Sequence, residues 1–381
     1  MMEIVYAKWL FDGKKLRKQT ACVLENNIVI DLLPLKVAKK LYPLSNFIDY
    51  GEGVLFSGFV NAHTHLELSN IKIEPYLGFV NWLKTMIESK KQDNENQLQN
   101  SIKIAVDTQI KNGVCALADI SNTLKTADYL TKIPKPIIFF ENYSLKKDIA
   151  NEKITYIENN IDNIKQKKYV KIYVSAHSIY STHKNLLKYT LLKNNPKIGN
   201  DLFSLHFLES EYENLFANSC GDLYEMLQQK GLIEDKLHYT SALEYIKSLG
   251  DIKKGLFVHC VYIKPHEIDF LKSKGSSIVI SPRSNYYISK TLPNLELLKK
   301  SGINVAIGTD SLASNWDLSI INELKFLYKY YSTIDPAYFF ELATLGGYNA
   351  LNLKIGFKKG FYAYPFFIRA STNNALEEIL Q

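Results

Sequence analysis

The sequence predicts an α/β fold, in which a (β/α)8 barrel carries a small β domain formed by both ends of the chain. Eight short apolar segments alternate with helical patterns through the middle of the chain, which is typical of parallel strands joined by helices. The chain has 381 residues, more than the ~250 of one barrel, so an additional smaller domain is expected. A doubly wound sheet is the structural alternative, because strand number alone does not distinguish it from a barrel.

The first part of the chain is predicted to form short strands separated by turns. The strand candidates are Ile4–Trp9, Thr20–Leu24 and Ile28–Leu32, with a turn signal at Asp12-Gly13. Near the other end, Gly356–Ile368 is aromatic and strand-like. We therefore expect residues 1–55 and 355–381 to form the β domain, and residues 56–354 to form the barrel.

The barrel strands are assigned to the apolar segments of the middle of the chain. They are Gly58–Asn61, Val114–Asp119, Ile137–Glu141, Val170–Ala176, Leu202–His206, Leu256–His259, Ser277–Ser281 and Asn304–Gly308. Phe79, Leu83 and Met86 recur at helical spacing and predict a helix after the first strand. The segments Ile102–Ile110 and Ile268–Lys274 follow the same pattern, whereas the polar run 90–100 is expected to be a loop.

Composition excludes several classes of protein. The 46 basic residues exceed the 39 acidic ones by 7, but they occur in scattered pairs, which indicates surface lysines and no nucleic-acid partner. Four cysteines lie far apart without a C-x-x-C pattern, so neither a zinc ribbon nor a secreted disulfide framework is expected. No signal peptide or membrane span is predicted, and we expect a cytoplasmic protein without a membrane partner.

Histidines gather where the predicted strands end. Five of the eight histidines lie at such positions; they are His63, His65, His177, His206 and His259. In a parallel barrel all carboxyl ends of the strands face one mouth, where active sites lie. We therefore expect these imidazoles to face the same space.

The pattern His63-x-His65 indicates a metal site. Residues i and i+2 of a strand point to the same side, so both imidazoles can bind one ion. His206 and Asp310, at later strand ends, would complete a set of nitrogen and oxygen ligands that suits Zn²⁺ or Fe²⁺ better than Ca²⁺ or Mg²⁺. Each histidine alone is also compatible with a structural role, but the set favours a metal.

Two further residues lie beside these candidate ligands. Glu209 follows His206 by three positions, and near a metal-bound water it would serve as a general acid/base; the alternative is a solvent-exposed loop glutamate. His259 would either bind the metal or hold the hydrolytic water. Cys260 is expected to fill the core rather than to act as a nucleophile.

Four motifs together resemble the amidohydrolase superfamily, in its deaminase and chlorohydrolase branch. They are Gly58-Phe59-Val60-Asn61-Ala62-His63-Thr64-His65-Leu66-Glu67, Ser281-Pro282-Arg283-Ser284-Asn285, Gly308-Thr309-Asp310-Ser311-Leu312-Ala313-Ser314-Asn315 and Ala343-Thr344-Leu345-Gly346-Gly347-Tyr348-Asn349-Ala350-Leu351. The resemblance implies a distorted (β/α)8 TIM barrel with a small β-sandwich built from both chain termini. Ser57, where proline is common, and the short tail after Gly360 depart from the family pattern within the sandwich.

The resemblance also implies the roles of the site residues. His63, His65, His206 and Asp310 would bind one divalent metal, most simply Zn²⁺ with Fe²⁺ as the alternative. His259 would orient the water, Asp310 would accept its proton, and Glu209 would pass a proton to a ring nitrogen of the substrate. The fourth strand ends in Ser175-Ala176-His177 without the lysine of binuclear relatives, which favours a single metal.

Within this branch, the segment Asn61 to Ser69 resembles aminodeoxyfutalosine deaminases of menaquinone biosynthesis. These enzymes act on an adenosine whose 5′ side carries a benzoate, so we expect water to replace the amino group at C6 with release of ammonia. Deaminases of adenosine, methylthioadenosine, adenosylhomocysteine or guanine, and a chlorohydrolase-like hydrolase, remain alternatives. A catalytically silent metal- or ligand-binding protein is the rival from another class, and a homodimer is left open.

Substrate contacts are expected from four more residues. Glu141 and His177 end two strands and would either bind the ribose hydroxyls or support the barrel mouth. Arg283 would either bind a substrate carboxylate through both guanidinium nitrogens or form an ion pair with a neighbouring loop. Glu67 would either contact substrate or support the histidines of the first strand.

Overall fold

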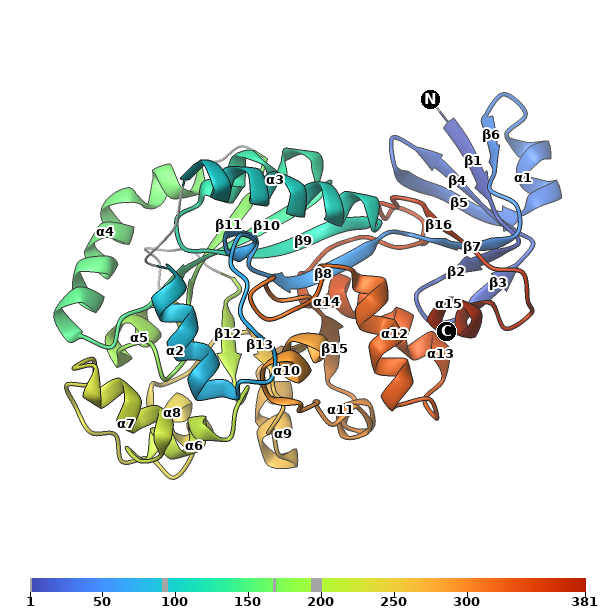
Figure 1. The fold of residues 1–381 in the computed structure, drawn as a ribbon. Coiled ribbons are helices and arrows are strands. Elements are labelled where there is room, and N and C mark those ends of the chain that lie inside the picture. The colour runs from blue at the N-terminus through green and yellow to red at the C-terminus, as the bar shows by residue number, and fades with distance from the viewer. Residues whose placement is uncertain (1, 91–94, 167–168, 193–200) are drawn as a thin grey trace.

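The computed structural model describes residues 2–90, 95–166, 169–192 and 201–381, and its centre consists of two parallel sheets (Figure 1). The first has the order β11-β10-β9-β8 and the second the order β12-β13-β14-β15. Their strands are β8 (Phe59–Thr64), β9 (Val114–Ser121), β10 (Lys135–Asn142), β11 (Lys171–Ala176), β12 (Ser204–Phe207), β13 (Leu256–His259), β14 (Ser277–Ile280) and β15 (Asn304–Ile307). Each strand overlaps one predicted segment, so the α/β class and the parallel strands are confirmed.

Isolated parallel bridges join the outer strands of the two sheets. One bridge pairs Thr64, at the end of β8, with Asp310, which follows β15, and the other pairs Ser178 with His206. The continuous ladders nevertheless end at four strands each. A fully closed barrel therefore stays a prediction, which these bridges support.

Helices follow most of the strands and cover the outside of the sheets (Figure 1). They are α2 (Phe79–Ser89), α3 (Glu95–Lys111), α4 (Lys147–Lys165), α5 (Lys184–Leu191), α6 (Tyr212–Ala217), α7 (Asp222–Gln229), α8 (Ala242–Ser248), α9 (Pro265–Ser273), α10 (Pro282–Ser289), α11 (Leu295–Ser301), α12 (Ile320–Tyr330), α13 (Pro336–Glu341) and α14 (Gly347–Ala350). The predicted loop 90–100 is partly wrong, because α3 begins at Glu95 and buries Leu98. Residues 91–94 of that run lie outside the described residues.

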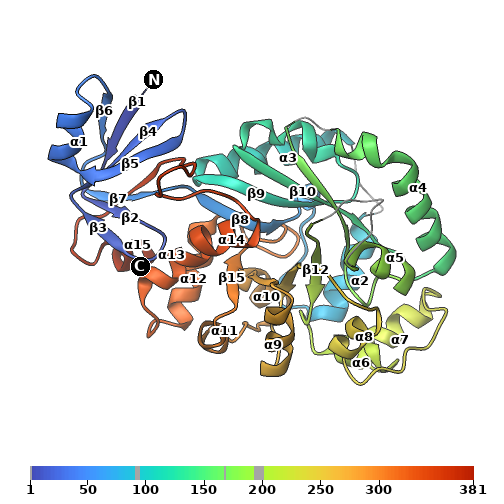
Figure 2. The same cartoon turned by 180° about the vertical axis from the view of Figure 1, so that it is seen from behind.

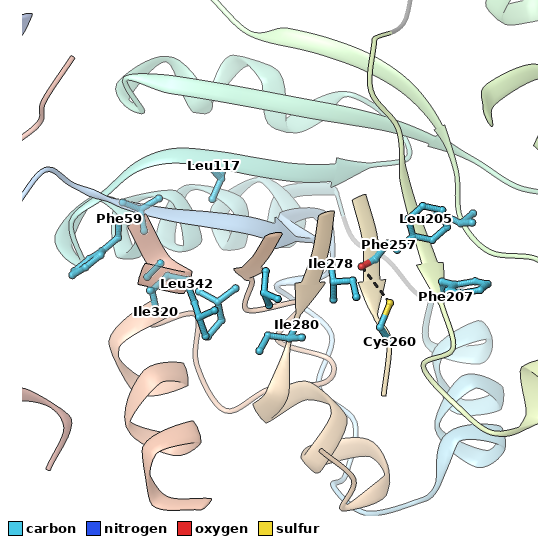
Figure 3. Close-up of a cluster of buried hydrophobic side chains, with 14 of the residues drawn as sticks. Phe59, Leu117, Leu205, Phe207, Phe257, Cys260, Ile278, Ile280, Ile320 and Leu342 are labelled. Carbon is cyan, nitrogen blue, oxygen red and sulfur yellow. Dashed lines mark hydrogen bonds between the residues drawn. The ribbon is translucent and has the colours of Figure 1, made fainter. Parts of the chain in front are cut away.

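The core lies between the strands and the helices that cover them. Figure 3 shows part of it, where apolar side chains from β8, β13 and β14 lie with residues of the later helices. Cys260 is buried in this cluster, and its thiol donates to the carbonyl of Phe257. Burial raises the pKa of the Cys260 thiol, which agrees with the expected core role.

Both ends of the chain contribute to a second group of sheets (Figure 2). One sheet has the order β5-β4-β1-β6 and the other the order β16-β7-β2-β3. Their elements are β1 (Met2–Tyr6), β2 (Trp9–Phe11), β3 (Leu16–Lys18), β4 (Thr20–Glu25), β5 (Ile28–Pro34), β6 (Asn46–Asp49), β7 (Gly53–Phe56) and β16 (Phe366–Arg369), with helices α1 (Leu35–Leu41) and α15 (Ala375–Leu380) beside them. The predicted strand Ile4–Trp9 is wrong in one respect, because Ala7 and Lys8 separate β1 from β2.

The two sheets of this second group share one apolar cluster. Val5 and Cys22 of the first sheet and Leu10 and Leu55 of the second belong to it. Ala363, which precedes β16, joins the same cluster, so a segment from the chain's end packs against strands from its beginning. A β-sandwich remains the prediction for this region, and the shared cluster supports it.

None of the helices in the described part of the chain combines the length and apolar character that crossing a bilayer requires.

Candidate active site

The strand ends bring four histidines and one aspartate together. The ring centroids of His63 and His65 lie 4.9 Å apart, and His206 lies 4.9 Å from His63. The Asp310 Oδ1 atom is 3.6 Å from His65 Nε2 and 3.8 Å from His63 Nε2. His259 lies beside His206, with His259 Nε2 3.1 Å from His206 Nδ1. Side chains separated by up to 247 positions (from 63 to 310) thus share one centre.

Close backbone contact between β8 and β15 fixes the position of Asp310. The backbone N–H groups of Thr309 and Asp310 both donate to the carbonyl of His63, at 3.0 and 3.1 Å. A Cβ atom on Gly308 would lie 2.6 Å from that carbonyl oxygen, so only glycine permits this approach. Asp310 itself adopts a φ of 57°, a strained conformation of the kind that often occurs at functional sites.

Hydrogen bonds orient the Asp310 carboxylate. Ser284 Oγ and Ser314 Oγ donate to its Oδ2 atom, at 2.6 and 2.8 Å. The other oxygen, Oδ1, faces His63 and His65. One oxygen is therefore held by hydroxyl groups and the other is directed at the imidazoles, as expected of a carboxylate that binds a metal through one oxygen.

The imidazoles meet the requirements of metal ligands. Ligand nitrogens of His63, His65 and His206 lie within 4.8 Å of one another. Both ring nitrogens of His63 and the Nε2 atom of His206 are buried without a hydrogen-bond partner among the described residues, which is costly unless another group binds them. Burial lowers the pKa of His63 and lowers that of His65 to about 3, so both rings are neutral with a free lone pair. With Asp310, this nitrogen and oxygen set fits Zn²⁺ or Fe²⁺.

Glu209 lies beside these rings with a shifted pKa. Its Oε1 atom is 3.6 Å from His259 Nε2 and its Oε2 atom is 3.7 Å from His206 Nδ1. Burial raises the pKa of Glu209 to about 7. This carboxyl can therefore both hold and release a proton near neutral pH, as a general acid/base requires. The alternative of a solvent-exposed glutamate is wrong, because Glu209 is buried.

Two residues that the sequence did not single out position these groups. The Asn285 side chain contacts His259 Nδ1 at 3.1 Å and holds that ring from its far side. The Glu213 carboxylate accepts from the backbone N–H of Glu209 at 2.7 Å and from that of Leu208 at 2.9 Å. Asn285 belongs to the Ser281–Asn285 motif, but Glu213 gave no signal beyond its place in an acidic loop.

Replacing Glu213 with Ala is expected to lower kcat roughly a hundredfold, because misplacement of a catalytic group by about 1 Å has that effect. The backbone around Glu209 would lose both of its carboxylate acceptors, whereas the cluster of His63, His65 and Asp310 would keep its contacts. Initial rates and bound metal measured on the same preparation test this. We expect normal metal content, and Glu213→Gln, which retains one acceptor, should lose less activity; an unchanged kcat in Glu213→Ala would contradict the positioning role.

The four predicted substrate contacts divide into two pairs. Glu141 and His177 line the cavity above the histidines; Asn122 Nδ2 donates to Glu141 at 3.0 Å, and the His177 ring stacks on His206 with centroids 4.4 Å apart. Glu67 lies outside the lining, where its carboxylate accepts from Asn122 and Thr123.

Arg283 also lies outside the cavity lining. Its Nη1 and Nη2 atoms donate to the two carboxylate oxygens of Asp317, at 2.6 and 2.9 Å. This bidentate pair corresponds to the alternative role, an ion pair with a neighbouring loop, and leaves both terminal nitrogens occupied. The ion pair with Asp317 supports the alternative role, and substrate binding by Arg283 stays a prediction.

The cavity has a volume of about 630 Å³, which is within the usual range for small-molecule sites. His65, His206, Glu209 and Asp310 line the end of the cavity at the histidine cluster. Apolar and aromatic residues form much of the remaining wall: Leu68, Trp82, Leu83, Met86, Ile87, Tyr143, Leu145, Ile149, Tyr180, Leu227 and Leu232. The arrangement suits a ligand that places a polar ring at the histidines and an apolar portion against the helices.

Comparisons with known proteins identify the family of the chain. The sequence model of the Amidohydrolase family matches residues 54–375. The chain is 31% identical over 291 residues to an adenosine deaminase of Helicobacter pylori, covering 74% of this chain and 70% of the relative. It is 28% identical over 331 residues to an aminodeoxyfutalosine deaminase of Nitratiruptor, covering 83% and 79% of the two chains.

Solved structures are similar over almost the full length. The chain matches the aminofutalosine deaminase of Helicobacter pylori in complex with methylthio-coformycin, with a TM-score of 0.90, 25% identity, and coverage of 99% of this chain and 96% of the other. An adenosine deaminase of Xanthomonas campestris with bound zinc matches with a TM-score of 0.78 and 18% identity, over 99% and 88% of the two chains. The second likeness concerns the fold alone.

Proposed function

The chain belongs to the amidohydrolase family, and from this premise we propose that it is a metal-dependent deaminase that hydrolyses the C6–amino bond of an adenine nucleoside derivative. A hydrolytic aminohydrolase that acts on a C–N bond agrees with the family and with its deaminase relatives. The observation that carries the proposal is the position of Glu209, a carboxyl with a pKa of about 7, beside the histidine and aspartate cluster. A binding protein without catalysis has no use for such a proton carrier.

His63, His65, His206 and Asp310 would hold the single divalent metal. When bound there, the metal would lower the pKa of a water from 15.7 toward ~7 and so supply a nucleophile at neutral pH. Zn²⁺ is the proposed metal, because neutral imidazole nitrogens and one carboxylate oxygen suit it, and Fe²⁺ is the alternative.

The protein's own groups move the protons. Asp310 accepts a proton from the attacking water, and His259, held by Asn285, keeps that water in line with C6 of the base. Glu209 donates a proton to N1, so that the ring can accept the electron pair. Ammonia then leaves C6 with the proton from Asp310, the C6 hydroxyl returns its proton to the Glu209 carboxylate, and an inosine-type base remains. Glu141 and His177, which line the cavity, would bind the ribose hydroxyls.

The substrate that fits best is 6-amino-6-deoxyfutalosine, an adenine nucleoside of menaquinone biosynthesis. The aminodeoxyfutalosine deaminase of Nitratiruptor and the aminofutalosine deaminase structure of Helicobacter pylori support it. Adenosine and the methylthioadenosine/adenosylhomocysteine pair are the alternatives that other relatives favour. Guanine and chlorohydrolase substrates remain further alternatives on the same scaffold.

Ammonia release from four nucleosides measured side by side tests this assignment. We expect aminodeoxyfutalosine to give a kcat/KM at least about tenfold above those of adenosine, methylthioadenosine and adenosylhomocysteine, which corresponds to ~1.4 kcal/mol of additional transition-state binding. A higher kcat/KM for one of the other three would replace the substrate but keep the reaction. No ammonia from any of them, with metal bound, would contradict the proposed function.

The domain division is proposed with the function. Residues 56–354 would form the closed (β/α)8 barrel that holds the site, and residues 1–55 with 355–381 would form a β-sandwich. The bridges between the outer strands of the two parallel sheets and the shared apolar cluster of the two smaller sheets support this division.

A further inference from the structure

A buried carboxylate outside the cavity joins the two segments that flank Asp310, and our inference about it rests on the metal site of the proposed function. Glu323 lies in the first turn of α12, is buried, and lies outside the cavity lining. Its Oε2 atom accepts from the backbone N–H of Arg283 at 3.0 Å, and its Oε1 atom accepts from Asn315 Nδ2 at 2.7 Å. One side chain therefore connects the segment after β14 to the segment after β15.

The first of these hydrogen bonds serves the N-terminus of α10, a helix that contacts α12. The first N–H groups of a helix have no acceptor within the helix and need one from outside. Ser281 occupies the N-cap position of α10, but among the described residues its side chain makes no capping hydrogen bond. The Glu323 carboxylate takes this place from another helix, and a negative charge is favourable at a helix N-terminus.

The turn of α10 that Glu323 holds carries one of the hydroxyl donors to Asp310. Ser284 directly follows Arg283, and its Oγ atom donates to Asp310 Oδ2 at 2.6 Å. Both residues belong to the first turn of α10, so a shift of the Arg283 backbone would move this hydroxyl away from the carboxylate.

The second hydrogen bond serves the loop after β15, which carries the other donor. Asn315 directly follows Ser314, whose Oγ atom donates to the same Asp310 Oδ2 atom at 2.8 Å. The Asn315 amide also donates to the carbonyl of Thr309 at 2.8 Å. The amide that Glu323 orients thus contacts the residue directly before Asp310 and adjoins the serine that binds its carboxylate.

We propose that Glu323 is a positioning residue for the metal site, which holds Ser284 and Ser314 in place so that the Asp310 carboxylate keeps its orientation. Oδ2 then stays bound by the two hydroxyls, and Oδ1 stays directed at the histidines of β8. Loss of the groups that orient a metal-binding side chain weakens metal binding by roughly 10–100-fold. Glu323 acts one contact further from the metal, so we expect an effect at the lower end of this range.

The Zn²⁺ affinity of the metal-depleted protein tests this role without turnover, by titration in competition with a chromophoric chelator. Glu323→Gln keeps the size of the side chain but replaces one acceptor with an NH₂ group, and it should weaken Zn²⁺ binding about tenfold. Glu323→Asp keeps the charge but is one methylene shorter, so it can serve only one of the two segments and should weaken binding to a similar extent. Wild-type affinity in both variants would overturn the positioning role.

A mutant cycle shows whether Glu323 acts through the two hydroxyls. Replacing Ser284 and Ser314 together with Ala removes both donors to Asp310 and should itself weaken Zn²⁺ binding about tenfold or more. Adding Glu323→Gln to this variant should then change the affinity by less than about twofold, because residues of one hydrogen-bond network do not act additively. A further tenfold loss would mean that Glu323 supports the site by another route, and would overturn the proposal.

Glu267→Gln is the matched control. Glu267 is also buried, and its Oε2 atom accepts from the backbone N–H of Lys264 at 2.7 Å, at the N-terminus of α9. The same chemical change at this other helix N-terminus should lower the temperature of thermal unfolding, as in Glu323→Gln, but leave Zn²⁺ affinity at its wild-type value. Equal weakening of Zn²⁺ binding in both variants would attribute the effect to lost stability and overturn the positioning role.

The role of Glu323 and the proposed function fail in different ways. If the wild type bound no Zn²⁺, the metal site would fail and both would fall with it. If the wild type bound Zn²⁺ and released ammonia while the variants kept wild-type affinity, only the role of Glu323 would fail. If Zn²⁺ affinity followed the expected pattern but no nucleoside released ammonia, the proposed reaction would fail and the role of Glu323 would stand.

Discussion

Replacing Glu209 with Gln is expected to reduce ammonia release by about 10²–10⁴-fold, the usual contribution of a general acid/base, while the metal stays bound. Gln has nearly the same shape but neither holds nor releases the proton that N1 of the base requires. The loop should keep its fold, because Glu213 holds Glu209 through the backbone N–H rather than through the side chain. Single-turnover rates and metal content of the purified variant test this expectation.

Glu211→Gln is the matched control, because Glu211 is an exposed glutamate two positions away on the same loop. It should keep wild-type turnover. Wild-type rates in Glu209→Gln would remove Glu209 from the mechanism. Loss of metal in that variant would instead indicate that Glu209 is a ligand, because its Oε2 atom lies 3.7 Å from His206 Nδ1.

The pKa of Glu209 also determines whether kcat rises or falls with pH. Burial raises it to about 7, and the form needed for donation to N1 is the protonated one. The fraction of this form falls as pH rises through the pKa, so wild-type kcat should decrease on the alkaline side. A cation at the histidine cluster favours the carboxylate form of Glu209 and lowers its pKa. The decrease in kcat would then begin at a lower pH, but kcat would still fall as pH rises.

The candidate ligands could be predicted from sequence because their positions follow from the regular geometry of the strands. The side-chain alternation of a strand places His63 and His65 on one side, and the common direction of parallel strands brings His206, His259 and Asp310 to the same end. Neither rule requires knowledge of loops. The structure accordingly brings all five residues into contact.

The residues that sequence did not reveal depend on how loops fold back. The spacing from His206 singles out Glu209, but Glu211 and Glu213 look equivalent in sequence. Only the turn into α6 buries Glu213, where its carboxylate accepts from the backbone N–H of Glu209. Arg283 likewise finds its partner in Asp317, 34 positions later, a pairing that no local pattern indicates. Long-range side-chain pairing therefore limits what sequence can predict of this site.

Removal of the metal is the second change with a very large expected effect. Incubation with a chelator should lower turnover by on the order of a thousandfold or more, because the attacking water would return toward its pKa of 15.7, and added Zn²⁺ should restore it. His65→Ala should lose both metal and activity, because its Nε2 atom faces Asp310 Oδ1 at 3.6 Å from within the cluster. Metal analysis beside rate measurements tests both statements.

The metal-free protein should nevertheless remain folded. Asp310 keeps the hydroxyls of Ser284 and Ser314, and the backbone contact between His63 and Thr309 does not involve the imidazoles. His238→Ala is the control, because His238 is exposed and lies outside the cluster, and it should retain full metal content. Full turnover in protein shown to be metal-free would contradict the assignment of His63, His65, His206 and Asp310, since no other part of the mechanism supplies a nucleophile at neutral pH.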